Sequence, residues 1–83
     1  MRITENLKAK LQKAKEKGYK RVYATVGSHR ATHYCYFVDI DKLLDQPVGT
    51  DYGPENRRGP WRGWPNTRHA RPDDIQYSRL FDL

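Results

Sequence analysis

The stretch from residue 57 to residue 71, RRGPWRGWPNTRHAR, carries the residue types best suited to binding an anionic polymer. It contains five arginines, two tryptophans and no acidic residue. Arginine binds a phosphate through a planar fork of donors, and a tryptophan ring is a flat surface on which a nucleobase can stack. This interleaving predicts a nucleic-acid contact surface formed by Arg57, Arg58, Trp61, Arg62, Trp64, Arg68 and Arg71.

The tryptophans of this stretch could instead serve the core. Tryptophan is strongly buried on average, and a short aromatic chain needs large side chains to fill its interior. Pro60 and Pro65 stiffen the stretch, so that less entropy is lost when it binds a partner. We therefore expect the arginines to face outward while at least one tryptophan is anchored inward.

The charge pattern supports two hypotheses about the partner. The formal net charge is +6, but basic and acidic blocks alternate along the chain. The basic blocks favour a non-sequence-specific nucleic-acid-binding accessory protein that contacts a single strand, an end or a junction. The acidic blocks would repel a phosphate backbone, and Trp, Tyr and Arg also dominate protein interfaces. The alternative is a protein-binding inhibitor or adaptor that blocks or redirects a larger complex, one that itself processes nucleic acid.

Catalysis and cofactor binding are not expected. Asp39 with Asp41 and Asp73 with Asp74 are carboxylate pairs of the kind that hold magnesium in nucleases, but no further residue completes such a pattern. The second pair also suits the first turn of a helix. Cys35 lies within a predicted strand with no activating base beside it, so we expect neither a nucleophile nor a metal site there.

Size and composition predict one small domain, residues 1–83, in the cytoplasm. The single cysteine cannot form an intramolecular disulfide, which is typical of reducing compartments. No apolar run approaches the roughly 20 residues needed to span a bilayer, so no membrane association is expected.

Residues 4–17 are predicted to form an amphipathic helix. Thr4 is a suitable N-cap, and Gly18 stands where a left-handed residue ends a helix. One narrow apolar stripe, consisting of Ile3, Leu7, Leu11 and Ala14, follows the helical period. Lysines flank this stripe, and Lys13 and Lys17 are candidates for additional phosphate contacts.

The chain then changes to the two-residue period of a β-hairpin. Pairing residue 22 with 38, 24 with 36 and 26 with 34 places both apolar sets on one face, toward the helix. His29 and Arg30 at the hairpin tip are possible further contacts. The second face carries Tyr23, Cys35 and Phe37 and needs a cover, which could be the C-terminal segment, a ligand or a second copy in a homodimer.

The remaining elements complete an α+β fold. Residues 41–46 predict a short helical turn, and residues 47–65 a long Pro/Gly/Arg/Trp loop. Residues 73–83 fit a C-terminal strand or a short helix. The predicted architecture is an N-terminal amphipathic helix packed on a small antiparallel hairpin or sheet, to which the C-terminal segment docks.

Overall fold

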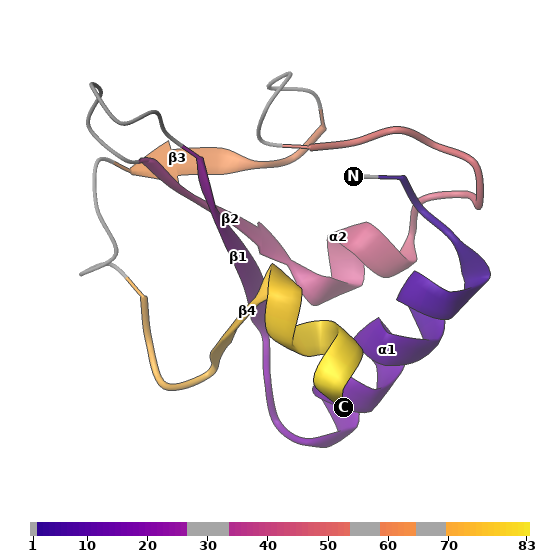
Figure 1. Cartoon of the computed structure of the whole chain (residues 1–83), viewed down its shortest axis with the longest axis horizontal. Helices are drawn as coiled ribbons and strands as arrows, with labels where there is room; N and C mark the ends of the chain where they lie inside the picture. Colours follow the sequence, from indigo (N-terminus) through magenta and orange to yellow (C-terminus); the bar gives the residue numbers. More distant parts are fainter. Residues whose placement is uncertain (1, 27–33, 54–58, 65–69) are drawn as a thin grey trace.

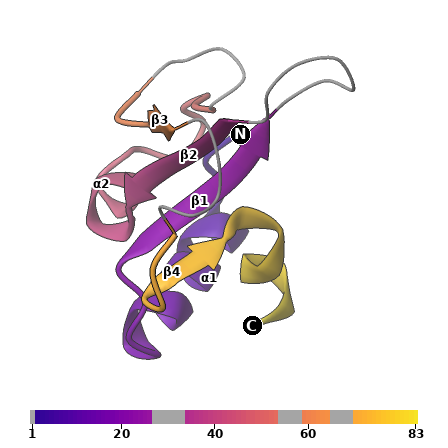
Figure 2. The same ribbon diagram turned by 90° about the vertical axis from the view of Figure 1, so that its left-hand side faces the viewer.

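A computed structural model describes residues 2–26, 34–53, 59–64 and 70–83 (Figure 1). A four-stranded sheet forms one layer: β1 (Arg21–Val26), β2 (Tyr34–Asp39), β3 (Arg62–Trp64) and β4 (Asp74–Gln76). The second layer consists of α1 (Glu5–Glu16), α2 (Ile40–Leu44) and the 3-10 helix η2 (Tyr77–Asp82). In Figure 2 the strands lie in front of α1, so the sheet has an inner face toward the helices and an outer face. The predicted α+β class is confirmed.

Helix α1 begins and ends where its sequence predicts. The hydroxyl oxygen of Thr4 accepts a hydrogen bond from the Leu7 backbone N–H at 3.0 Å, which satisfies one of the unpaired amides of the first turn. Gly18 adopts a φ of 100°, a conformation that costs glycine little and other residues more. Leu7, Leu11 and Ala14 are all buried, so the predicted stripe is the face that packs on the sheet.

The hairpin has the predicted register. Val22 pairs with Val38, Ala24 with Tyr36 and Val26 with Tyr34. Because side chains alternate along a strand, Val22 and Val38 both reach the inner face, where they join the buried cluster that includes Leu7 and Leu11. Each fully buried leucine stabilises the fold by about 2 kcal/mol relative to leaving it exposed.

The sheet is larger than predicted, and it is mixed rather than antiparallel. Its order is β3-β2-β1-β4, with β3 antiparallel to β2 and β4 parallel to β1. The stretch predicted to be a long loop therefore contains strand β3. The C-terminal segment forms both predicted alternatives in succession, a strand and then a helix.

The C-terminal segment packs on the helical side. Leu80 of η2 is fully buried with the α1 leucines, and the Lys10 ammonium donates to the backbone carbonyl of Leu83. This segment is therefore not the cover that the outer face was expected to need.

The outer face covers its own aromatic residues. Phe37 is only 3% exposed and Cys35 is fully buried within the single chain. The Arg21 guanidinium lies 4.5 Å from the centroid of the Phe37 ring, and the Tyr23 ring lies 5.8 Å from it. A cation over an aromatic face is electrostatically favourable. Cys35 and Phe37 of the surface that suggested a homodimer are thus already buried, Tyr23 is partly buried, and the dimer stays a prediction.

An ion pair fixes β4 against β1. Nε and Nη2 of Arg21 each donate to one carboxylate oxygen of Asp74 at 2.8 Å, and the Asp74 side chain is fully buried. Asp74 also accepts the backbone N–H of Arg71 at 2.8 Å. The hydrogen bonding that Arg21 donates to Asp74 raises the pKa of Arg21, so the guanidinium remains charged.

The structure gives Asp39, Asp41 and Asp74 different surroundings. Asp39 ends β2, whereas Asp41 lies in α2 and forms an exposed ion pair with Lys15 at 2.6 Å. Asp74 is a strand residue engaged with Arg21, not part of a helical first turn.

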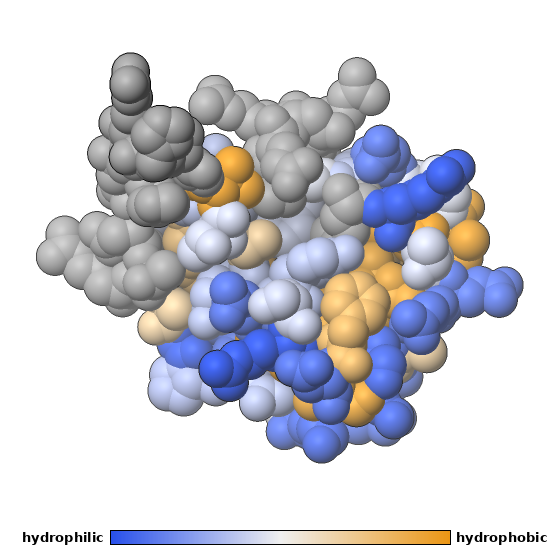
Figure 3. Space-filling view, viewed as in Figure 1, coloured by the Kyte–Doolittle hydropathy of each residue, from blue (hydrophilic) through white to orange (hydrophobic). Residues whose placement is uncertain are grey.

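Polar residues dominate the surface seen in Figure 3. On that face blue polar atoms separate small orange apolar areas. Within the described residues, no helix combines the length and the apolar character that crossing a bilayer requires.

The Arg21–Asp74 pair is expected to be worth far more than the exposed Lys15–Asp41 pair. Asp74→Asn should lower the free energy of unfolding by about 3 kcal/mol, because it leaves a half-buried guanidinium without its counter-charge. Asp41→Asn is the matched control and should cost less than about 1 kcal/mol. Urea unfolding of both variants measures this; equal losses would contradict the central role of Asp74.

Candidate nucleic-acid interface

The structure describes six of the predicted contact residues. They are Trp61, Arg62, Trp64 and Arg71, together with Lys13 and Lys17 of the helix. Arg57, Arg58 and Arg68, and the hairpin-tip residues His29 and Arg30, lie outside the described residues and stay predictions.

Strand β3 places Arg62 and Trp64 side by side on the outer face. Arg62 pairs with Phe37 of β2 and Trp64 pairs with Cys35, both of which face outward. Arg62 is exposed, and Trp64 is 44% exposed. A cation and an indole ring at i and i+2 of one strand lie about 7 Å apart and share one face.

A groove runs beside these two residues. Its volume is about 220 Å³, and its described lining consists of Arg21, Phe37, Val38, Asp39, Lys42, Pro60, Arg62 and Trp64. Three of these residues are cationic and one, Asp39, is acidic. The groove therefore combines net positive charge with an aromatic wall, which suits a phosphate and an adjoining base.

Trp61 faces the opposite way from Trp64. It packs against the buried cluster on the inner side of the sheet, so the prediction that one tryptophan is anchored inward is confirmed. Its indole Nε1–H is buried and has no hydrogen-bond partner among the residues that the structure describes. Buried indole N–H groups normally find an acceptor, which makes this donor unusual.

Arg71 lies at the other end of the sheet, just before β4. It contributes to a hollow of about 540 Å³ whose lining includes Tyr23, Gln76 and Arg79. Arg71 and Arg79 are both exposed. Asp74 and Asp82 also line this hollow, so its two cations at the border opposite β3 are accompanied by two acids.

One row of outer-face side chains joins the two ends. The strand register brings Arg62, Phe37, Tyr23 and Gln76 into line across β3, β2, β1 and β4. Three strand spacings of about 4.8 Å make this row about 14 Å long. A single strand crossing the sheet along the row would meet arginine, aromatic and amide groups in turn.

The helix lysines do not belong to this surface. Lys13 and Lys17 are exposed on α1, which lies on the opposite side of the sheet from Arg62 and Trp64 (Figure 2). The structure therefore separates them from the arginine-tryptophan residues with which they were grouped.

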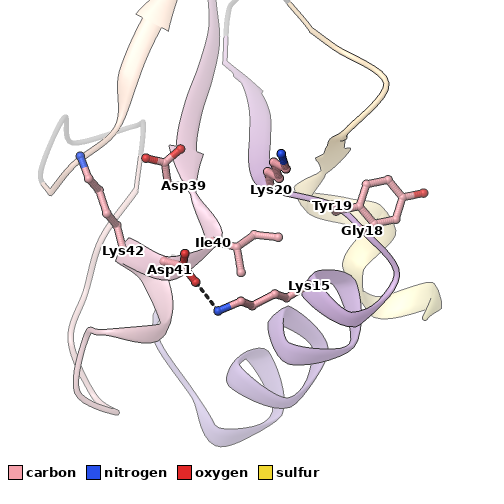
Figure 4. A pocket seen from close by; sticks show the side chains of 8 residues that line it. All are labelled: Lys15, Gly18, Tyr19, Lys20, Asp39, Ile40, Asp41 and Lys42. Carbon is pink, nitrogen blue, oxygen red and sulfur yellow. Dashed lines mark hydrogen bonds and ion pairs between the residues drawn. The ribbon is translucent and has the colours of Figure 1, made fainter.

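A wide hollow of about 620 Å³ between α1, β1 and α2 is a weaker candidate. Figure 4 shows its eight lining residues: Lys15, Gly18, Tyr19, Lys20, Asp39, Ile40, Asp41 and Lys42. The ammonium group of Lys15 is engaged by Asp41, and Lys20 and Lys42 point in different directions. Mixed charges that do not converge make a poor anion site.

Cys35 is unsuited to act as a nucleophile. It is fully buried, and this desolvation raises the pKa of its thiol, which keeps the nucleophilic thiolate from forming. Among the described residues, no group of three or more His, Cys, Asp or Glu side chains is placed to hold a metal ion.

Sequence reasoning missed Arg21, Lys42 and Gln76 as parts of this surface. The hairpin register already placed Arg21 on the outer face beside Tyr23 and Phe37, so its position could have been found from the two-residue period. No local pattern in the sequence predicts that Lys42 and Gln76 lie beside the outer face of the sheet.

Comparisons with protein-family models, with curated proteins and with solved structures find no match to this chain.

The two tryptophans should respond differently to a water-borne quencher. Acrylamide should quench the fluorescence of Trp61→Phe, which retains only Trp64, more strongly than that of Trp64→Phe, which retains Trp61. The physical reason is that Trp64 is 44% exposed, whereas Trp61 packs on the core. Equal Stern–Volmer constants for the two folded variants would contradict this placement.

Proposed function

We propose that this protein is a small cytoplasmic nucleic-acid-binding accessory protein that binds single strands, ends or junctions without sequence specificity. The observation that carries the proposal is the placement of Arg62 and Trp64 on one face of β3, beside a cationic groove. Phosphates would contact Arg62 and Lys42, and a base would stack on Trp64. Arg57, Arg58, Arg68 and Arg71 would extend the phosphate contacts.

The distribution of acidic residues supports this proposal over a protein partner. The charge pattern of the sequence raised the objection that acids would repel a phosphate backbone. Asp74 is buried under Arg21 and Asp41 is paired with Lys15, so both charges are balanced within the fold. Among the lining residues that the structure describes, only Asp39 brings an acid to the groove.

A single strand fits the geometry better than a duplex. Base stacking on Trp64 requires a base whose face is accessible, as in single strands and at ends. The described elements include no helix placed to enter a major groove, because α1 packs on the inner face of the sheet. Affinity would therefore come from charge and stacking, which are sequence-tolerant.

Labelled single- and double-stranded oligonucleotides, titrated over a range of salt concentrations, test the proposal. Binding should favour the single strand and weaken steeply with salt. Arg62→Gln should reduce the slope of log K against log salt by about 0.7 for one lost phosphate contact. Trp64→Ala should weaken binding by about 1–3 kcal/mol through lost stacking.

Lys13→Gln is the matched control for Arg62→Gln, because it removes one exposed positive charge from the other side of the sheet. It should leave the salt slope nearly unchanged. Equal effects of the two variants would show attraction to net charge without a site. An absence of binding near physiological salt would overturn the proposal and leave the protein-binding inhibitor as the explanation of the arginine-tryptophan surface.

A further inference from the structure

A second aromatic surface lies on the inner side of β3, beyond the helices. Tyr34, Tyr36, Trp61 and Gly63 line a hollow of about 330 Å³ there. Tyr34 is 44% exposed, and its ring centroid lies 6.1 Å from that of Tyr36 at an interplanar angle of 34°. The two rings thus form a shallow corner that a flat molecule could contact.

Gly63 leaves room for the Tyr36 ring beside the backbone of β3. A Cβ atom at this position would lie 2.5 Å from Cε1 of Tyr36, closer than any real contact. The Tyr36 ring therefore lies directly on the strand backbone, where any larger residue would displace it. This arrangement keeps the aromatic wall flat against β3.

The chemistry of the lining restricts the ligand. The described lining residues are three aromatic side chains and a glycine, so the contact that this hollow offers is stacking against a flat ring. A nucleobase presents such a flat face, and the strand that carries it would already be held at Arg62 and Trp64 by the proposed contacts.

We infer that this hollow is a second nucleobase site, on the opposite side of β3 from Trp64. The inference rests on the proposed function and deepens it. Trp61 and Trp64 are three residues apart, about 10 Å along an extended strand, and face opposite sides. β3 is an end strand of the described sheet, so a bound single strand would pass around it with one base on each side and its phosphates near Arg62.

The two indole groups give each site its own signal. The chain has only two tryptophans, so the indole region of a ¹⁵N–¹H spectrum of the full protein should contain two Nε1–H signals. Trp61→Phe and Trp64→Phe assign them. A short oligothymidylate should shift both signals, because a base stacked beside each indole changes the magnetic environment of its Nε1–H. An otherwise identical abasic oligonucleotide should leave the Trp61 signal in place.

The outcomes separate the two proposals. A shift of the Trp64 signal without any shift at Trp61 would overturn the second base site and leave the proposed function standing. Unchanged indole signals together with no binding would overturn both. A Trp61 shift that the abasic strand reproduces would also overturn the inference, because it would show a rearrangement rather than base contact.

A pair of exposed aromatic residues provides an independent test by affinity. Tyr34→Ala should weaken oligothymidylate binding about 5- to 100-fold through the loss of one stacked base. Phe81→Ala is the matched control, because Phe81 is exposed to a similar degree, 41% against 44%, but lies on η2. Equal affinities of the two variants, with both folded by circular dichroism, would overturn the inference.

Discussion

The bidentate ion pair between Arg21 and Asp74 connects more of this molecule than any other interaction described. It ties β4 to β1 across a separation of 53 residues. Through Arg71 it also sets the path by which the chain enters β4. The guanidinium then covers Phe37, which removes an aromatic ring from water on the face that has no helix. Without this pair, the pairing of β4 with β1, the cover over Phe37 and the path of the chain at Arg71 would each be less stable.

A buried ion pair between two strands has a large desolvation free-energy cost, because both charges lose hydration. Here the geometry offsets that cost. Both carboxylate oxygens accept guanidinium donors, and one of them also accepts a backbone amide, so the acceptor capacity of Asp74 is well used. The pair also selects one strand register. An apolar residue at position 74 could pack in several registers, whereas the planar guanidinium of Arg21 matches the Asp74 carboxylate in only one.

Local patterns in the sequence predicted the elements whose determinants are local. The helix, its Thr4 cap and its Gly18 terminus depend on residues within a few positions of each other. The hairpin register depends on a two-residue period that continues over six residues in each strand. Strands β3 and β4 have three residues each, which is too short for a period to be recognised. Their places in the sheet depend on contacts with distant residues.

The same distinction applies to the candidate site. Composition and spacing predicted outward arginines, as Arg62 is, and at least one inward tryptophan, without distinguishing Trp61 from Trp64. They grouped Lys13 and Lys17 with the arginines because all are basic, although the sheet lies between them. They also treated Asp74 as helix chemistry, because its partner Arg21 is far away in the chain. Charge is visible in a sequence, whereas the face on which it is presented is not.

The parallel pairing of β4 with β1 determines when the protein can fold during its synthesis. Ile75 and Leu80 seal a core whose other members come from the first half of the chain. A nascent chain that has emerged only as far as β3 has its helix and its hairpin, but one side of that core is open to water. Stable folding must therefore wait until Leu80 is available, so the helix and the hairpin do not form a stable unit before β4 and η2 join them.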